Sequence, residues 1–379
     1  MKEESLLLLS DLQKLINQVV LIDYTIIILG GDDMFNKNLK YYRLKKNMSK
    51  KELASLIGVT PMAITYYESG ERKPNMDTIK AMAKALGIKI SDFLNNRNEN
   101  LTFVHGEFRK GSKLAVSQQE YIREDVEEYM GRFYSVVNIL GGEVLPDAPT
   151  VNEITLTGNL EEDAKKMREY LGISVAGPIG NLIQLLENRG ILVYACDIEN
   201  DAFSGMNGLV NERPYIVFNK NMSPERIRST IAHEMAHFIF QWPDEMEDKE
   251  IEKMATAISG AFLFPETDAK RELGLRRTKV SKDMTLICRE YGISMYLLVK
   301  RAALCGIITS SVEKDFYIKA GKAGWKKNEP VWSQAEIPAL FELLVFRAVS
   351  ENEITVQKGA ELLKQSYDFV DEHCFAAEE

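Results

Sequence analysis

Two of the four histidines in this 379-residue chain lie four positions apart, in the run HEMAH at 233–237. A serine and a proline at 223–224 would cap the helix that carries this run. Because helical residues i and i+4 lie one turn apart, both imidazoles can reach one ion, and imidazole favours zinc over calcium or magnesium. Glu234 is placed to take a proton from a zinc-bound water. The spacing predicts one Zn²⁺ per chain, with His233 and His237 as ligands and Glu234 as the catalytic base; the structural alternative is two core histidines bonded to the backbone.

A catalytic zinc needs a third protein ligand and one open position. After a turn at 241–243, a second helix is predicted from about Asp248 to Phe264. Glu252 stands where the side chains of this helix first turn inward, so we predict it as the third ligand, with Glu250 as the alternative. The other two histidines lie in a linker and near the end of the chain. No Tyr or His suggests itself for oxyanion stabilisation.

The metal motif lies in an acidic part of the chain that follows a basic segment. Residues 37–89 carry twelve Lys and Arg against four Asp and Glu, a balance of +8, whereas the whole chain is at −9. The remainder therefore carries −17. A compact basic module on an acidic body predicts a polyanionic partner for that module alone.

Capping signals within the basic segment predict a helix-turn-helix. Ser49 and Glu52 form a capping box, and Gly58 ends the first helix. Thr60 and Pro61 open the second helix, which Gly70 ends. A third amphipathic helix is predicted over 76–86, with Ile64 and Tyr67 of the second helix facing the core. The structural alternative is a plain helical bundle with a solvated basic face.

In a helix-turn-helix the second helix enters the major groove of double-stranded DNA, N-terminal residues first. The residues predicted to read base edges lie on the outer face of this helix: Met62, Thr65 and Tyr66. Thr60, at its start, is also predicted to contact DNA. The residues predicted to lie near phosphates are basic: Arg43, Lys50, Lys51, Arg72 and Lys73. Such modules commonly bind two half-sites as dimers, so we expect a homodimer on an operator.

The run NLKYYRLKKNMSKKELASLIGVTPMAITYYESGERKPNMDTIKAMAKALGI, residues 38–88, resembles the DNA-binding domains of the XRE/Cro family of phage repressors. The resemblance implies an all-α DNA-binding fold. Pro61 and Met62 stand where repressors often carry polar base readers, which leaves the operator sequence open.

The runs RSTIAHEMAHFIF (228–240) and EIEKMATAISGAFLFP (250–265) resemble the ImmA/IrrE metallopeptidases. Counting back from Pro265, the resemblance places the family's third-ligand glutamate on Glu252. It implies a zincin-like α+β domain over about 155–310, with a small sheet drawn from ILVYACDI, NGLVNE and RPYIVFN. It also implies cleavage of repressor proteins, often of the XRE kind. The family's usual glycine in the motif is Ala236 here.

The connector between these parts has two interpretations. Residues 92–113 are polar and are predicted as a linker, and a heptad-spaced apolar stripe follows it, comprising Ile122, Val126, Tyr129, Phe133, Val136 and Leu140. The stripe fits a dimerisation helix or a helix docked on the body. Residues 281–308 fit a helical hairpin that completes the peptidase domain, with a second DNA reader as the alternative.

We expect an α+β, predominantly helical chain: an all-α DNA-binding domain, a linker helix, a zincin-like domain and C-terminal helices. The predicted parts are an N-terminal extension (1–33), a helix-turn-helix domain (34–96), a linker with connector helix (97–150), a metallopeptidase domain (151–310) and a C-terminal helical region (311–379). We expect the extension to precede a native start at Met34; a short helix packed on the body is the alternative.

The composition predicts a globular protein of the cytoplasm. Hydrophobic residues make up 45% and charged residues 27%, the four cysteines are scattered, and no apolar run approaches the ~18 residues of a membrane span. We expect a DNA-binding regulator with a built-in zinc endopeptidase that cleaves itself or a partner repressor to relieve repression. The alternative is an antitoxin-like autorepressor of a toxin–antitoxin or mobile-element operon, in which the metal domain binds a toxin. A general peptidase with an incidental DNA tether has less support.

Overall fold

The computed structural model describes residues 32–94, 101–106, 114–325, 329–331 and 333–374. The predicted N-terminal extension lies outside the described residues, except for its last two positions. The chain divides into two compact units: Met1–Glu99 with Ala115–Gly131 (unit 1), and Asn100–Leu114 with Arg132–Glu379 (unit 2). Within the described ranges, no helix combines the length and the apolar character needed to cross a bilayer.

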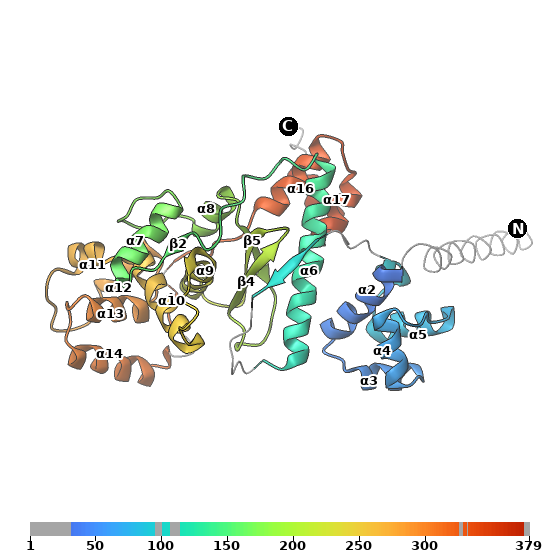
Figure 1. Cartoon of the computed structure of the whole chain (residues 1–379), viewed down its shortest axis with the longest axis horizontal. Coiled ribbons are helices and arrows are strands. Elements are labelled where there is room, and N and C mark those ends of the chain that lie inside the picture. The colour runs from blue at the N-terminus through green and yellow to red at the C-terminus, as the bar shows by residue number, and fades with distance from the viewer. Residues whose placement is uncertain (1–31, 95–100, 107–113, 326–328, 332, 375–379) are drawn as a thin grey trace, which may run out of the picture. The chain divides into compact units, whose positions relative to one another are not determined.

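Unit 1 is helical, as predicted (Figure 1). Its elements are α2 (Asp32–Lys45), α3 (Lys50–Ile57), α4 (Pro61–Ser69), α5 (Met76–Leu86), the 3₁₀ helix η1 (Ile90–Leu94) and the first part of α6 (Val116–Ile139). The predicted capping box joins Ser49 and Glu52 at the start of α3, and Thr60 caps α4 ahead of Pro61. The hydrogen bonds from Ser49 lower the pKa of Glu52. Local capping chemistry therefore places both helices of the motif.

The core of unit 1 forms where α4 packs on α2 and α3. Ile64 and Tyr67 are buried, as predicted, next to Leu39 and Leu53 of the neighbouring helices. Because these side chains fill one face of α4, the opposite face is left to solvent.

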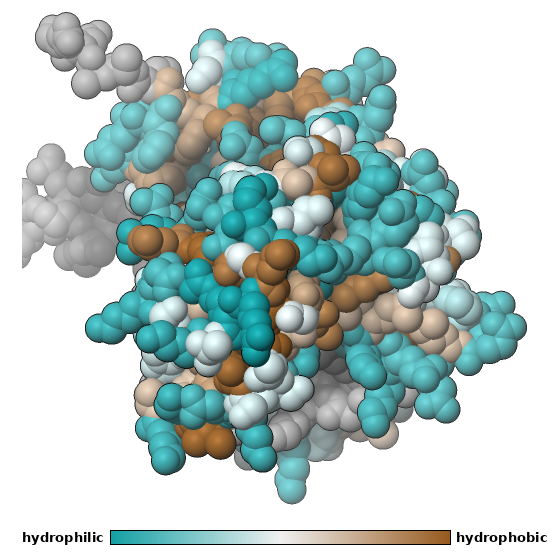
Figure 2. All heavy atoms as spheres, turned by 90° about the vertical axis from the view of Figure 1, so that its left-hand side faces the viewer, coloured by the Kyte–Doolittle hydropathy of each residue, from teal (hydrophilic) through white to brown (hydrophobic). Residues whose placement is uncertain are grey.

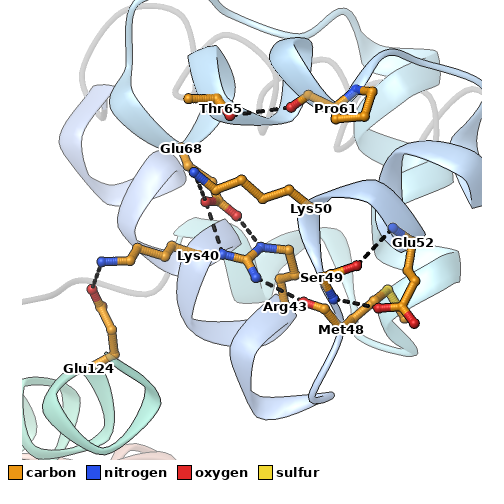
Figure 3. Close-up of polar contacts among 10 residues, drawn as sticks. All are labelled: Lys40, Arg43, Met48, Ser49, Lys50, Glu52, Pro61, Thr65, Glu68 and Glu124. Atoms are coloured by element: carbon orange, nitrogen blue, oxygen red, sulfur yellow. Dashed lines mark hydrogen bonds and ion pairs between the residues drawn. The ribbon is translucent and has the colours of Figure 1, made fainter. Parts of the chain in front are cut away.

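Arg43 corrects one prediction about the basic residues (Figure 3). Its guanidinium is buried and forms a two-pronged ion pair with Glu68 of α4, with Nη2 3.1 Å from Oε2. Its Nη1 donates to the carbonyl of Met48 at 2.8 Å. All three guanidinium nitrogens are thus used inside the fold, so the predicted phosphate contact of Arg43 is wrong. The planar fork of arginine suits such a bidentate internal pair.

The connector helix α6 buries its apolar stripe within the chain. Ile122, Val126, Phe133 and Val136 are all buried. In unit 1, Lys40 lies 3.0 Å from Glu124 (Figure 3), and the Tyr41 hydroxyl donates to Asp125 at 3.2 Å. The structure therefore favours the docked helix over the dimerisation helix.

Unit 2 contains a four-stranded mixed sheet in the order β1-β4-β5-β3. Its strands are β1 (Phe103–His105), β3 (Leu192–Cys196), β4 (Gly205–Val210) and β5 (Arg213–Asn219). β4 is antiparallel to β1 and to β5, whereas β3 is parallel to β5. The three predicted segments form β3, β4 and β5. The strand β1 lies in the segment predicted as linker, because its pairing partner is about a hundred residues away and leaves no local signal.

One long helix packs on this sheet, and a second packs on the first (Figure 1). α9 (Pro224–Ile239) packs on β4 and β5, and α10 (Asp248–Leu263) packs on α9. The remaining elements up to residue 304 are β2 (Ile154–Thr155), α7 (Leu160–Tyr170), α8 (Leu182–Asn188), β6 (Phe240–Gln241), α11 (Glu266–Leu273), α12 (Met284–Tyr291) and α13 (Met295–Leu304). β2 and β6 form a separate parallel pair.

The helices α12 and α13 form the predicted hairpin. Met284, Ile287 and Leu298 join the same core as α9 and α10, which supports the interpretation that this hairpin completes the domain. The face of unit 2 that carries α11 to α14 is largely hydrophilic, with separate apolar side chains between the polar ones (Figure 2). The C-terminal helices are α14 (Ser310–Lys322), α16 (Leu340–Ser350), α17 (Val356–Leu363) and α18 (Tyr367–Cys374).

Replacing Arg43 by alanine should destabilise unit 1 by about 3 kcal/mol, because the buried carboxylate of Glu68 would lose its bidentate partner and keep only the longer contact with Lys50. Hydrogen exchange of peptides from α2 to α4, measured on the full chain in increasing urea, reports this loss. The double variant Arg43→Met with Glu68→Leu should lose much less, since no charge is then left buried. Equal losses in the single and the double variant would contradict the ion-pair explanation.

Candidate functional site

The side chains of the HEMAH run lie on the buried helix α9. Ser223 accepts a hydrogen bond from the Arg226 amide and Pro224 fills the first turn, as predicted, so the helix begins at the position that sets the orientation of the motif. His233 and Glu234 are buried, while His237 is partly exposed. The motif therefore stands where the core meets solvent.

The structure brings Glu252 of α10 to the two imidazoles. The Nε2 atoms of His233 and His237 are 3.1 Å apart. Glu252 Oε2 lies 3.4 Å from His233 Nε2, and Oε1 lies 3.4 Å from His237 Nε2. Glu250, the alternative ligand, is exposed in the first turn of α10 and is not part of this group.

The spacing of these atoms fits a zinc ion. Ligands about 2.0–2.1 Å from a tetrahedral zinc lie about 3.3 Å from one another. Two imidazole nitrogens and a carboxylate oxygen form the ligand set of many catalytic zinc sites, which leave a fourth position open. Across the described residues, His233, His237 and Glu252 form the one group of this kind.

Two further side chains hold this group in place. The Thr256 hydroxyl donates to the backbone carbonyl of Glu252 at 2.8 Å and lies 3.3 Å from His233 Nδ1. Because its proton is used by the carbonyl, its oxygen is left to accept from His233 Nδ1, which turns the Nε2 lone pair toward the other ligands. Trp242 Nε1 donates to the carbonyl of His237 at 3.2 Å.

Glu234 follows His233 directly on α9 and is not part of the group of candidate ligands. Its Oε2 accepts a hydrogen bond from Asn207 Nδ2 of β4 at 2.9 Å. The sequence analysis missed Asn207, because nothing in the spacing of the strand connects it to the motif. It also missed Thr256, although its position four residues after Glu252 places both on one face of α10.

The predicted DNA-contacting residues other than Arg43 lie at the surface of unit 1. Met62 and Tyr66 are 57% and 38% exposed on α4. The Thr65 hydroxyl donates to the Pro61 carbonyl at 3.3 Å (Figure 3), and the Thr60 hydroxyl accepts from the Ala63 amide at 3.2 Å.

The basic members of the set are also accessible. Lys51, Arg72 and Lys73 are exposed. Lys50 is partly exposed and lies 3.5 Å from Glu68 Oε2, so it shares the carboxylate that holds Arg43 (Figure 3). The exposed face of α4 thus carries apolar and hydroxyl-bearing side chains, and the exposed cationic side chains of Lys51, Arg72 and Lys73 lie outside this helix.

Comparison with known proteins gives two family matches in this chain. Residues 39–93 match the helix-turn-helix family, and residues 186–303 match the IrrE N-terminal-like domain. The second match includes α9, α10 and the hairpin of α12 and α13, so unit 2 contains a metallopeptidase-like fold.

Three similar proteins are transcriptional regulators. The HTH-type transcriptional activator BcrR of Enterococcus faecalis is 33% identical over 79 residues, which are 21% of this chain and 38% of BcrR. The cryptic phage CTXphi transcriptional repressor RstR of Vibrio cholerae is 26% identical over 68 residues, 18% of this chain and 61% of RstR. The chain thus spans less than two thirds of the length of either protein.

The HTH-type transcriptional regulator MJ0272 of Methanocaldococcus jannaschii is 39% identical over 59 residues, which are 16% of this chain and 88% of that protein. Together with the helix-turn-helix match, this similarity covers the capped helices described above. The chain therefore belongs to the HTH-type transcriptional regulators and carries an IrrE N-terminal-like domain in the same polypeptide.

Proposed function

We propose that this protein is a DNA-binding transcriptional regulator whose second unit is a zinc-dependent endopeptidase that cleaves the chain itself or a partner repressor. The observation that carries the proposal is the meeting of His233, His237 and Glu252 at 3.1–3.4 Å, with Glu234 beside them. Cleavage would relieve repression, because a regulator that is cut loses the link between its DNA-binding and other parts.

The residues of unit 2 divide the chemistry between them. His233, His237 and Glu252 would hold the zinc, which, when bound, polarises a peptide carbonyl and lowers the pKa of its water. Asn207 fixes Glu234 Oε2, so Oε1 is the oxygen that would take the proton from the attacking water. The same carboxyl group then gives this proton to the leaving amine, as general acid–base catalysis requires.

The residues of unit 1 would bind an operator. α4 would enter the major groove, with Thr60, Met62, Thr65 and Tyr66 toward the base edges and Lys50, Lys51, Arg72 and Lys73 toward phosphates. A homodimer would place two such helices on two half-sites. A regulator that acts on DNA would work in the cytoplasm, and the free cysteines of the described residues are consistent with such a reducing compartment.

Metal analysis and cleavage assays test the peptidase. We expect one zinc per chain in the parent and in Glu234→Gln, and much less in Glu252→Ala, because two imidazoles alone hold zinc weakly. Proteolysis of the chain and of XRE-type repressors should fall by at least about 100-fold in Glu234→Gln, since the base is gone while the metal stays. Glu250→Ala is the matched control and should keep both zinc and activity. Undiminished cleavage by Glu234→Gln would falsify the mechanism.

Titration of operator DNA at several salt concentrations tests the DNA-binding face. Lys51→Ala should weaken binding to all sequences alike and reduce the slope of log K against log salt by about 1, because one phosphate contact is lost. Tyr66→Ala should instead change the preferred sequence, by about 1–3 kcal/mol for the base that it contacts. If Tyr66→Ala selects the same sites as the parent from a random DNA pool, the proposed reading face is wrong.

A further inference from the structure

The strand β1 covers an edge of the sheet in unit 2. It pairs with β4 so that Val104 lies opposite Leu209. At one end of the pairing the Asn211 amide donates to the Thr102 carbonyl at 2.9 Å, and at the other the Gly106 amide donates to the Asn207 carbonyl at 2.8 Å. Because β5 holds the opposite edge of β4, β1 occupies the edge that β4 would otherwise offer for pairing.

The covered edge leads to the candidate catalytic base. Asn207, whose carbonyl accepts from Gly106, is the residue whose side chain donates to Glu234 Oε2 at 2.9 Å. A strand paired with β4 therefore contacts Asn207, and Asn207 in turn contacts Glu234, the carboxylate that would activate water. Extended peptides bind proteins by adding a strand to a sheet edge, where the backbone provides the affinity. This edge of β4 is thus suited to hold an extended peptide beside Glu234.

The backbones of β1 and β4 approach so closely that two positions require glycine. A Cβ atom at Gly106 would lie 2.5 Å from the Asn207 carbonyl oxygen, and one at Gly208 would lie 2.6 Å from the Val104 carbonyl oxygen. Only glycine allows this approach at both positions. His105 Nδ1 lies 2.6 Å from the hydroxyl of the buried Tyr215, which anchors the middle of the segment.

We propose that this edge of β4 is a docking site for an extended peptide, and that residues 102–106 of the chain itself occupy it. β1 is then an intramolecular competitor: a tethered strand acts at a high effective concentration, so a separate peptide binds well only after β1 leaves. β1 and a separate peptide compete only for binding to the edge of β4. The consequence of this competition, slower proteolysis, rests on the proposed peptidase function.

Proline at position 104 removes β1 from the edge. In the antiparallel pairing, Val104 is at the hydrogen-bonded position between those of Thr102 and Gly106, so Val104→Pro deletes a ladder donor. Its side chain is 64% exposed, so little packing is lost. Val104→Thr, which keeps the amide and suits a strand, is the matched control.

The probe is a fluorescein-labelled, C-terminally amidated hexapeptide with the sequence of residues 101–106, Leu-Thr-Phe-Val-His-Gly. Fluorescence anisotropy is measured on full-length chains with chelator present, so that no cleavage occurs. We expect the Val104→Pro chain to bind the peptide at least about tenfold more tightly than the parent and Val104→Thr. Equal affinity for all three chains, or no binding to any of them, overturns the proposal.

Hydrogen exchange provides a second measurement. Amides of β4 should exchange faster in Val104→Pro than in Val104→Thr, and added peptide should slow them again. If Val104→Pro fails to fold, as judged by thermal unfolding, Gly106→Ala replaces it, because the added Cβ pushes the end of β1 off Asn207; it should tighten peptide binding in the same direction. The test measures binding only, so it gives an answer even if the protein has no peptidase activity. Conversely, a peptide that binds every chain equally overturns the proposal even if proteolysis is observed.

Discussion

The packing of α10 against α9 is the constraint on which the candidate metal site depends. α9 packs on β4 and β5, and its two imidazoles lie next to α10, which packs on α9. α10 meets them there with a carboxylate: the two Nε2 atoms are 3.1 Å apart, and each lies 3.4 Å from one oxygen of Glu252. This places two nitrogens and a carboxylate in close contact at the rim of the core. Such a preformed cluster is what zinc requires, since its ligands must be held ready at tetrahedral spacing.

In unit 1, some of the basic side chains stabilise the fold and others are exposed. Its excess of basic residues predicts a polyanion partner, yet the basic side chains are not equivalent. Arg43 is consumed within the fold, where it joins α2 to α4 through Glu68, and Lys50 lies close enough to share that carboxylate. The ion pair fixes how α4 stands on the rest of the unit, and so which of its side chains are presented to solvent. Arg43, predicted on the DNA surface, is instead part of the contact that joins α2 to α4.

The strand β1 links the two units along the chain. It lies in the segment between the helices of the DNA-binding unit and α6, yet it pairs with a strand of the peptidase-like unit. A short strand on a sheet edge is held mainly by its backbone hydrogen bonds, which another extended segment can replace one for one. The linker segment thus pairs with the sheet in addition to joining two parts of the chain, and in our proposal its detachment frees the edge of β4 for a separate peptide.

What the sequence determined by itself is local. The caps at Ser49, Thr60 and Ser223 and the i, i+4 spacing of the histidines specify helices and their orientation through contacts within a few residues, which is why α3, α4 and α9 agree with prediction. The tertiary structure decided what depends on elements far apart in the chain: Glu252 rather than Glu250 beside the imidazoles, the burial of Arg43, the bond from Asn207 to Glu234 and the pairing of β1. Charge and periodicity describe one element at a time, whereas each of these contacts exists only after two elements have packed together.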